Sequence, residues 1–239
     1  MSHMSILGII PARGGSKGIP KKNLVKILDK SLLHYAINAA KKSHYIDKYY
    51  VSTDDEEISL AAKELNSSVI QRPIELASDT SKSIEVIKHA INFVEKEKSI
   101  YPEILVLIQP TTPFRDSSDI DRAIEIIKKK NCDSVVSVAQ TPSHFNFEWQ
   151  LKINSNGFLK MIDESSLSKM ATQRQKLTNT YFRNGAVYIS KVDVIKKYNN
   201  IYGNNSVPYV MPLKKSINID SYDDLELAKF SATKSFTSK

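Results

Sequence analysis

The sequence contains a single cysteine and no long apolar run, and both absences exclude classes of protein. Cys132 is the one cysteine among 239 residues, so no disulfide can form within the chain, and a cysteine-based metal site is not expected. No apolar stretch reaches the roughly 20 residues that a membrane-spanning helix needs. Residues 6–10 are apolar but have no basic segment before them, which indicates a buried strand rather than a signal peptide. We therefore expect a cytoplasmic protein without membrane contact.

Two common nucleotide-binding motifs are absent from the glycine-rich loop at residues 10–23. It has neither the Gly-x-x-x-x-Gly-Lys-Ser/Thr spacing of a Walker loop nor the Gly-x-Gly-x-x-Gly of a dinucleotide fold. The loop instead places Gly14 and Gly15 between the cations Arg13 and Lys17. Glycines let backbone N–H groups approach phosphate oxygens, and the cations supply opposite charge, so the loop predicts a phosphate site. The alternative is a flexible basic loop without a ligand.

Composition is that of a globular chain, and the positive net charge suits an anionic partner. Hydrophobic residues make up 41% of the sequence and charged residues 25%, enough for one large α/β domain with a small appendage. The formal charge of +8 fits nucleic acid or small anionic substrates. The lysines are scattered, as at residues 128–130, without interleaved aromatic residues, so we expect no nucleic-acid partner. Residues 1–4 have the look of an expression-tag scar.

Strand-like and helix-like segments alternate along most of the chain. Strands are predicted at residues 6–10, 49–52, 68–70, 104–108, 134–138, 185–189 and near 217–219. Helix starts are predicted from capping-box spacing at Thr53 with Glu56, Ser118 with Asp121, and Ser221 with Asp224. Because helices separate the strands, we predict an α/β fold, a Rossmann-like and mostly parallel sheet with helices on both faces. Residues 5–139 and 179–232 would form this single domain.

Residues 140–178 interrupt the alternation. Segments 149–153 and 158–162 flank a polar turn at 154–157, which predicts a β-hairpin. The rest of the insertion, at 163–178, is polar and has no clear period. We expect an inserted arm that serves in oligomerisation or as a lid; a surface excursion without a role is the alternative.

The first loop also carries a family resemblance. The run Ile10-Pro11-Ala12-Arg13-Gly14-Gly15-Ser16-Lys17-Gly18-Ile19-Pro20-Lys21-Lys22-Asn23 resembles the signature of acylneuraminate cytidylyltransferases, also called CMP-sialic acid synthetases. Further segments match that family in order, at residues 51–55, 72–73 with 76–80, 109–115 and 182–189. The likeness runs from about residue 6 to 227. The related enzymes for the eight-carbon acid Kdo have a different phosphate loop.

The resemblance implies a nucleotidyltransferase domain that binds CTP and a nonulosonic acid. The nucleotide would contact Pro11, Ala12, Arg13, Gly14, Gly15, Ser16, Lys17, Lys22, Asn23, Arg72 and Ser83. The sugar would contact Gln109, Thr111, Arg174, Arg183 and Tyr188. Taken alone, Arg72 and Tyr188 fit structural roles at least as well, and Ser83 fits a helix cap as well as a ligand contact. The family forms homodimers that exchange the 140–178 arm, so Arg174 could serve the partner's active site.

The expected metal site departs from the family pattern. Family members present Asp-x-Asp before the last helix to hold Mg²⁺ (or Mn²⁺), whereas this chain has Asn218 and Asp220. Strand alternation would place both side chains on one face, and Mg²⁺ accepts neutral oxygens as well as carboxylates. Arg13, Lys17 and Asp220 would be the catalytic residues. A lysine that the family carries near residues 147–148 is also absent.

The resemblance thus implies transfer of CMP from CTP to the anomeric hydroxyl of N-acetylneuraminate or a bacterial analogue, legionaminate or pseudaminate, with release of pyrophosphate. Such an enzyme would work in the bacterial cytoplasm. One alternative is a nucleotidyltransferase that acts on a sugar-1-phosphate. Another is a non-catalytic nucleotide-binding protein, which the loss of one carboxylate at Asn218 would fit. The sequence identifies no general base.

Overall fold

The computed structural model describes residues 4–78 and 80–237. Of the tag predicted at residues 1–4, residues 1–3 lie outside the described part. A seven-stranded sheet forms the centre of the molecule, in the order β11-β7-β10-β6-β1-β4-β5. Its strands are β1 (Ile6–Pro11), β4 (Lys48–Thr53), β5 (Ser68–Gln71), β6 (Ile104–Leu107), β7 (Ser134–Gln140), β10 (Tyr181–Lys191) and β11 (Ser206–Val210). The sheet is mostly parallel, as predicted, with β10 antiparallel to both of its neighbours.

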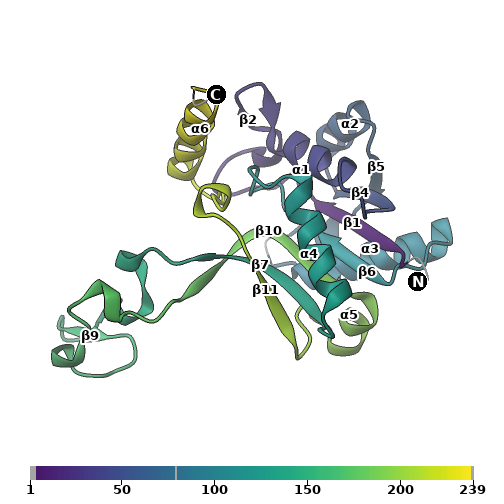
Figure 1. Cartoon of the computed structure of the whole chain (residues 1–239). Coiled ribbons are helices and arrows are strands. Elements are labelled where there is room, and N and C mark those ends of the chain that lie inside the picture. Colours follow the sequence, from purple (N-terminus) through teal and green to yellow (C-terminus); the bar gives the residue numbers. More distant parts are fainter. Residues whose placement is uncertain (1–3, 79, 238–239) are drawn as a thin grey trace.

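Helices cover both faces of the sheet (Figure 1). One face packs against α1 (Leu32–Lys41), α2 (Glu56–Glu64) and α4 (Ser117–Lys129). The other packs against α3 (Ser83–Lys98) and α5 (Val192–Tyr198). The strands are short and rich in valine, isoleucine and leucine because both faces of a covered parallel sheet are buried. No helix in the described ranges is long and apolar enough to cross a bilayer.

A third apolar cluster lies beside the sheet, beneath the last helix. There α6 (Tyr222–Thr237) packs on the small ribbon of β2 (Lys26–Ile27) and β3 (Lys30–Ser31). Its fully buried members include Ile19, Ile27, Leu32 and Ile219. This cluster fixes the segment before α6 against the loop that follows β1, because Ile19 and Ile219 come from those two segments.

The insertion after β7 extends far from the body of the molecule, with β8 (Leu151–Ile153) and β9 (Leu159–Met161) at its outer part (Figure 1). These two strands pair antiparallel and are joined by a turn that begins at Asn154, as the hairpin prediction requires. The rest of the arm is built from the 3-10 turns η3 (Ser143–Phe145), η4 (Phe147–Trp149), η5 (Leu167–Lys169) and η6 (Arg174–Lys176). The predicted domain boundaries at 139–140 and 178–179 stay predictions.

Two predicted helix caps are wrong, and one is confirmed. The α2 cap is Asp55, which accepts from Ile58 N, because Thr53 is the buried last residue of β4 and its hydroxyl accepts from Asp55 N. The α4 cap is Asp116, which forms a capping box with Asp119. At α6 the predicted pair is correct, since Asp224 N donates to the Ser221 hydroxyl and Ser221 N donates to the Asp224 carboxylate.

The strand predicted near residues 217–219 is also wrong. The segment joins no sheet, and Ile219 N donates instead to Thr111 O at 2.8 Å. The apolar alternation arises because Ile219 is buried in the third cluster and Ile217 packs against it. The strand that occupies the sheet edge is β11, which precedes this segment and pairs with β7.

Candidate active site

A cavity of about 420 Å³ opens at the carboxyl ends of the central strands. Pro11 ends β1, Leu107 ends β6 and Arg72 directly follows β5, and all three line the cavity. The segment before α6 closes another side with Asp220. Ligands of open α/β sheets bind at this edge, where the loops after adjacent parallel strands meet.

The loop after β1 is held in place on both sides. Gly14 N donates to Asp54 Oδ1 at 3.2 Å, and the Asn23 amide donates to Arg13 O at 3.0 Å. Gly18 lies so close to the Asp220 carbonyl oxygen that a Cβ would collide with it. The buried Asn23 side chain therefore serves the loop's backbone, and the glycine at position 18 lets the loop approach the segment before α6.

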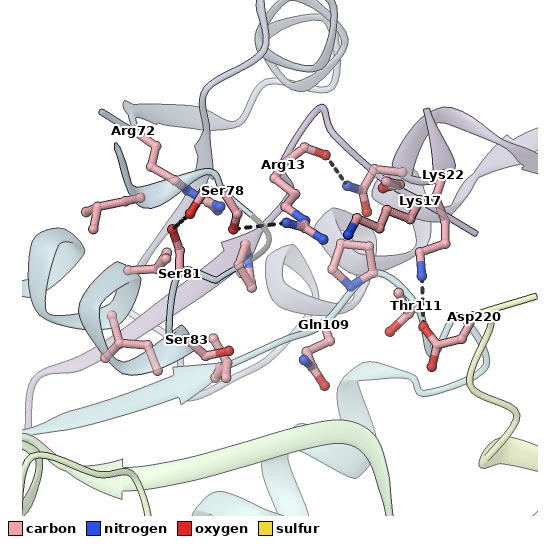
Figure 2. A pocket seen from close by; sticks show the side chains of 18 of the residues that line it. Arg13, Lys17, Lys22, Arg72, Ser78, Ser81, Ser83, Gln109, Thr111 and Asp220 are labelled. Carbon is pink, nitrogen blue, oxygen red and sulfur yellow. Dashed lines mark hydrogen bonds and ion pairs between the residues drawn. The ribbon is translucent and has the colours of Figure 1, made fainter. Parts of the chain in front are cut away.

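Four cationic side chains line the cavity, and Asp220 is the one carboxylate among the described lining residues. In Figure 2, Arg72 lies on one side of the cavity, Lys17 and Lys22 lie on the other, and Arg13 lies between them. The Arg13 guanidinium donates to Ser78 O at 3.1 Å. This excess of positive charge favours a polyanionic ligand such as a triphosphate.

Arg72 is buried and anchored to the end of β4. Its Nη2 donates to Ser52 O at 2.6 Å and its Nε to Ser52 Oγ at 3.2 Å. Burial lowers the pKa of Arg72, and the charge of Asp54 opposes part of that shift. The side chain thus supports the strand edge and also lines the cavity, so the structural and ligand-binding interpretations of its sequence position are compatible.

The loop after β6 supplies Gln109, Pro110 and Thr111 to the cavity. Arg115 lies fully buried beneath it and donates to Gln109 O at 2.6 Å and to Thr112 O at 3.0 Å. Burial lowers the pKa of Arg115 to about 9, because Asp119 offsets only part of the desolvation. A single guanidinium therefore holds both ends of the turn that presents Gln109.

The cavity brings together eleven of the residues predicted from the sequence: Pro11, Arg13, Ser16, Lys17, Lys22, Asn23, Arg72, Ser83, Gln109, Thr111 and Asp220. It is not lined by Ala12, Gly14, Gly15, Asn218, Arg174, Arg183 or Tyr188. Tyr188 is buried beside Leu107 in the α3-side cluster, and burial raises its pKa. Arg183 donates to the Tyr202 hydroxyl at 2.5 Å. Arg174 lies on the arm, beside a separate small cavity.

Sequence reasoning missed the wall formed by the connection from β5 into α3. Five of its residues line the cavity: Leu76, Ser78, Ser81, Val86 and Ile87. Ser81 Oγ bonds both Ser78 Oγ and Glu75 O, which gives this wall a defined shape (Figure 2). The matched segment at residues 76–80 was the available signal, because it follows a strand at the ligand-binding edge.

The donor set at Asp220 does not fit a divalent ion in the free chain. Lys22 Nζ donates to Asp220 Oδ1 at 2.8 Å, and the Asn218 amide donates to Asp220 Oδ2. Both carboxylate oxygens therefore face N–H groups. Among the described residues no group of three or more His, Cys, Asp or Glu side chains could hold a metal. The predicted meeting of Asn218 and Asp220 does occur, although in an unpaired loop rather than a strand.

Comparison with known proteins gives consistent similarities. A family model described as "Cytidylyltransferase" matches residues 7–202. The N-acylneuraminate cytidylyltransferase of Escherichia coli O18:K1:H7 is 34% identical over 93% of this chain, which spans 51% of that protein. The pseudaminic acid cytidylyltransferase of Campylobacter jejuni serotype O:2 is 32% identical, with 95% of each chain covered.

Solved structures share the fold at lower sequence identity. The structure of CMP:2-keto-3-deoxy-manno-octonic acid synthetase complexed with CTP superposes with a TM-score of 0.68 at 14% identity, and covers 97% of this chain and 99% of its own. A 4-diphosphocytidyl-2C-methyl-D-erythritol synthase from Anaerococcus prevotii superposes with a TM-score of 0.66 at 10% identity, covering 97% of this chain and 100% of its own. At these identities the likeness establishes the fold.

Proposed function

This chain belongs to the cytidylyltransferase family, and from that premise we propose that it transfers CMP from CTP to the anomeric hydroxyl of a nonulosonic acid, with release of pyrophosphate. The observation that carries the proposal is the cationic cavity at the strand ends, lined by Arg13, Lys17, Lys22 and Arg72. Relatives named for N-acylneuraminate and for pseudaminic acid match it at similar identity, so the proposal covers the sugar class. The chain spans about half the length of the E. coli relative and nearly all of the C. jejuni one.

In this proposal the position of the nucleotide is set by the positive charges that line the cavity. The triphosphate lies against Arg13, Lys17 and the amides of the loop after β1, where glycines allow close approach. The cytidine lies toward Arg72 and Ser83, on the opposite side of Arg13 from the lysines (Figure 2). Polar groups there discriminate the base edge through hydrogen bonds, because an unmatched buried polar group is costly.

The sugar part of the proposal begins at Gln109 and Thr111. These residues offer an amide and a hydroxyl to the substrate's polar groups from a turn that Arg115 holds. A guanidinium suits a carboxylate, and Arg183 and Arg174 are the candidates for that contact. Arg174 belongs to the arm, so in this proposal it reaches the active site of a partner in a homodimer. Tyr188 of β10 lies opposite Leu107, which lines the cavity, and would support the proposed pocket from behind.

In the reaction, the anomeric hydroxyl oxygen attacks the α-phosphorus of CTP. A new phosphorus–oxygen bond forms to the sugar, the bond to the bridging β-phosphate oxygen breaks, and the hydroxyl proton is released. Arg13, Lys17 and Lys22 stabilise the charge that develops on the phosphates, and their preorganisation is the main source of rate. The expected dependence on Mg²⁺ or Mn²⁺ stays a prediction. The reaction belongs in the cytoplasm, where CTP is made.

The test is a product assay with the purified protein. CTP is offered with N-acetylneuraminate, legionaminate and pseudaminate in turn, and mass spectrometry follows the products. We expect a CMP-linked sugar, one pyrophosphate per product, and little reaction with ATP, GTP or UTP. If product forms only from a sugar-1-phosphate, the proposed nonulosonic acid acceptor is wrong. Nucleotide binding with no pyrophosphate release from any sugar contradicts the enzymatic proposal and leaves a nucleotide-binding protein.

A further inference from the structure

Lys22, Asn218 and Asp220 form one corner of the cavity region, and the Lys22 ammonium lies there at the carboxylate where a metal ion was expected. Asp220 Oδ1 accepts from Lys22 Nζ at 2.8 Å, and Asp220 Oδ2 accepts from the Asn218 amide nitrogen. The Asn218 carbonyl oxygen points the other way, to 3.4 Å from the Thr112 hydroxyl. A divalent cation needs lone pairs directed at one point. Here N–H groups point at the carboxylate instead.

The two members of the ion pair differ in exposure. The Lys22 side chain is 15% exposed, whereas that of Asp220 is 66% exposed. A largely buried ammonium is stable only with a close anion or several acceptors, because desolvation disfavours its charge. Asp220 is thus the close anion of the Lys22 ammonium, and the contact directs the ammonium at the cavity, which both residues line (Figure 2).

The neighbouring carboxylate offers no second ligand. Asp224 Oδ2 accepts from Asp220 N, Ser221 N and the Ser221 hydroxyl, and these bonds begin α6. Releasing Asp224 to a metal would therefore break the cap of the helix.

We propose that Lys22 is the resident cation of this corner, and that Asp220 is a positioning residue that directs its ammonium toward the phosphate site. The free protein accordingly binds no divalent ion here. The formal charges of Lys22 and Asp220 cancel, so the pair offers a divalent ion no net negative charge. That the anion met by Lys22 is a nucleotide phosphate rests on the proposed function; the state of the free corner does not.

The experiment is a titration of the nucleotide-free protein with Mn²⁺, followed by the electron paramagnetic resonance signal of the unbound ion. We expect no saturable site in the wild type below millimolar Mn²⁺. Lys22→Met removes one positive charge and Asn218→Asp adds one negative charge. Each should tighten Mn²⁺ binding at least about tenfold, and the double variant more than either. Asp220→Asn in the double-variant background should abolish the gain.

Lys21→Met is the matched control. Lys21 is the adjacent residue, carries the same charge and pairs with Glu57 outside the cavity, so its loss should leave Mn²⁺ binding unchanged. A wild-type site of submillimolar affinity that Asp220→Asn removes would overturn the proposal. So would equal gains in Lys21→Met and Lys22→Met, or no gain in the double variant while circular dichroism shows it folded. None of these measurements needs CTP, so their outcome does not depend on whether the proposed reaction occurs.

Discussion

Gly14 and Gly15 are adjacent in the sequence but have different surroundings. A Cβ on Gly14 would lie 2.5 Å from Asp55 Oδ2 and 2.8 Å from Asp55 Cβ, at the cap of α2. A Cβ on Gly15 would meet nothing within 4 Å. The fold therefore requires glycine at the first position, whereas the second has room for a side chain, so glycine there fits the proposed close approach of a phosphate.

This difference gives a paired prediction. Gly14→Ala should destabilise the protein by about 1–3 kcal/mol through overpacking. That corresponds to several degrees of Tm, at roughly 2–4 °C per kcal/mol for a chain of this size. Gly15→Ala should keep the wild-type Tm but weaken CTP binding at least about tenfold, because its methyl group keeps phosphate from the loop amides. Thermal unfolding and calorimetry measure the two effects; a Gly15→Ala melting point as low as that of Gly14→Ala contradicts the assignment.

Arg13 and Lys17 should matter for rate more than for stability. Removing one preorganised charge donor typically lowers kcat about 10²-fold or more. We expect Arg13→Ala and Lys17→Ala to fold with nearly native circular dichroism and to lose most turnover of CTP. Lys63→Ala, on the exposed face of α2, removes the same charge away from the cavity and should keep full activity. Near-wild-type rates in both cavity variants would show that the charges act elsewhere.

Cavity-lining residues next to strand ends were predictable from the sequence, because a short segment of sequence shows where a strand ends. Arg13, Arg72 and Gln109 each lie within a few residues of a strand end and line the cavity. Val86 and Ile87 line it as well, but apolar residues of an amphipathic helix have the same pattern whether they face core or ligand. What brings them to the cavity is the path of the chain from β5 to α3, which no local pattern encodes.

Among the elements, the turn after β6 depends on one buried group. Arg115 Nε lacks a hydrogen-bond partner in the described structure, and both Nη atoms bond carbonyls of the turn. Arg115→Met should raise the KM for the sugar acid more than the KM for CTP, because the turn presents Gln109 while other elements hold the nucleotide. Arg115→Lys keeps the charge and should recover part of the sugar KM. Equal rises in both KM values would indicate a general loss of structure instead.

A second link joins the start of α4 to the segment before α6. Lys215 Nζ bonds Asp116 Oδ2 at 2.6 Å and Asp119 Oδ2 at 2.8 Å, and the Tyr209 hydroxyl donates to Asp119 Oδ1. Burial raises the pKa of Asp116, but the bonds from Lys215 and Ser118 outweigh it and lower the pKa to about 2. The folded state therefore favours the ionised carboxylate.

The stabilisation from this link should depend on pH. A carboxylate with a lowered folded-state pKa stabilises the fold above its unfolded pKa of about 3.9 and loses that contribution as the pH falls toward about 2. Lys215→Met should thus be less stable than the wild type at pH 7, with the gap shrinking between pH 4 and pH 2. Lys214→Met is the control, because Lys214 is exposed on the 3-10 turn η7 (Leu213–Lys215) that also carries Lys215. Urea unfolding across this range measures the gap, and a constant difference contradicts the link.

The start of a helix was predictable where the sequence contains only one suitable capping residue. Ser221 begins α6 as predicted because Asp224 is placed to return its bond. At α4 the same spacing at Ser118 competed with Asp116, whose carboxylate takes the cap two residues earlier. The apolar alternation at residues 217–219 arises because its apolar residues are packed against α6, and it does not reflect strand pairing. Periodicity reports which side is buried, and pairing partners come from elsewhere in the chain.

For the whole molecule, the alternation of strands and helices was enough to predict a mostly parallel, doubly covered sheet. The sequence did not reveal that β10 runs antiparallel between β6 and β7, nor that β11 forms the edge. Strand order depends on how long connections pack, and here the long arm separates β7 from β10. The arm itself exposes large apolar side chains, with Ile153 at 72% and Phe158 at 69%, and a second copy of the chain is the proposed cover.

The proposed exchange of arms has a quantitative test in mixed dimers. If Arg174 serves the partner's site, a heterodimer of Lys17→Ala and Arg174→Ala subunits contains one intact site, with Lys17 from one subunit and Arg174 from the other. Random assembly of equal amounts makes half of the dimers mixed, so activity should recover to about a quarter of wild type. Co-expressing Lys17→Ala with Arg13→Ala should recover nothing, because every site then carries one defect. If Arg174 acts within its own subunit, the first mixture also stays inactive, and light scattering that finds only monomers removes the basis for exchange altogether.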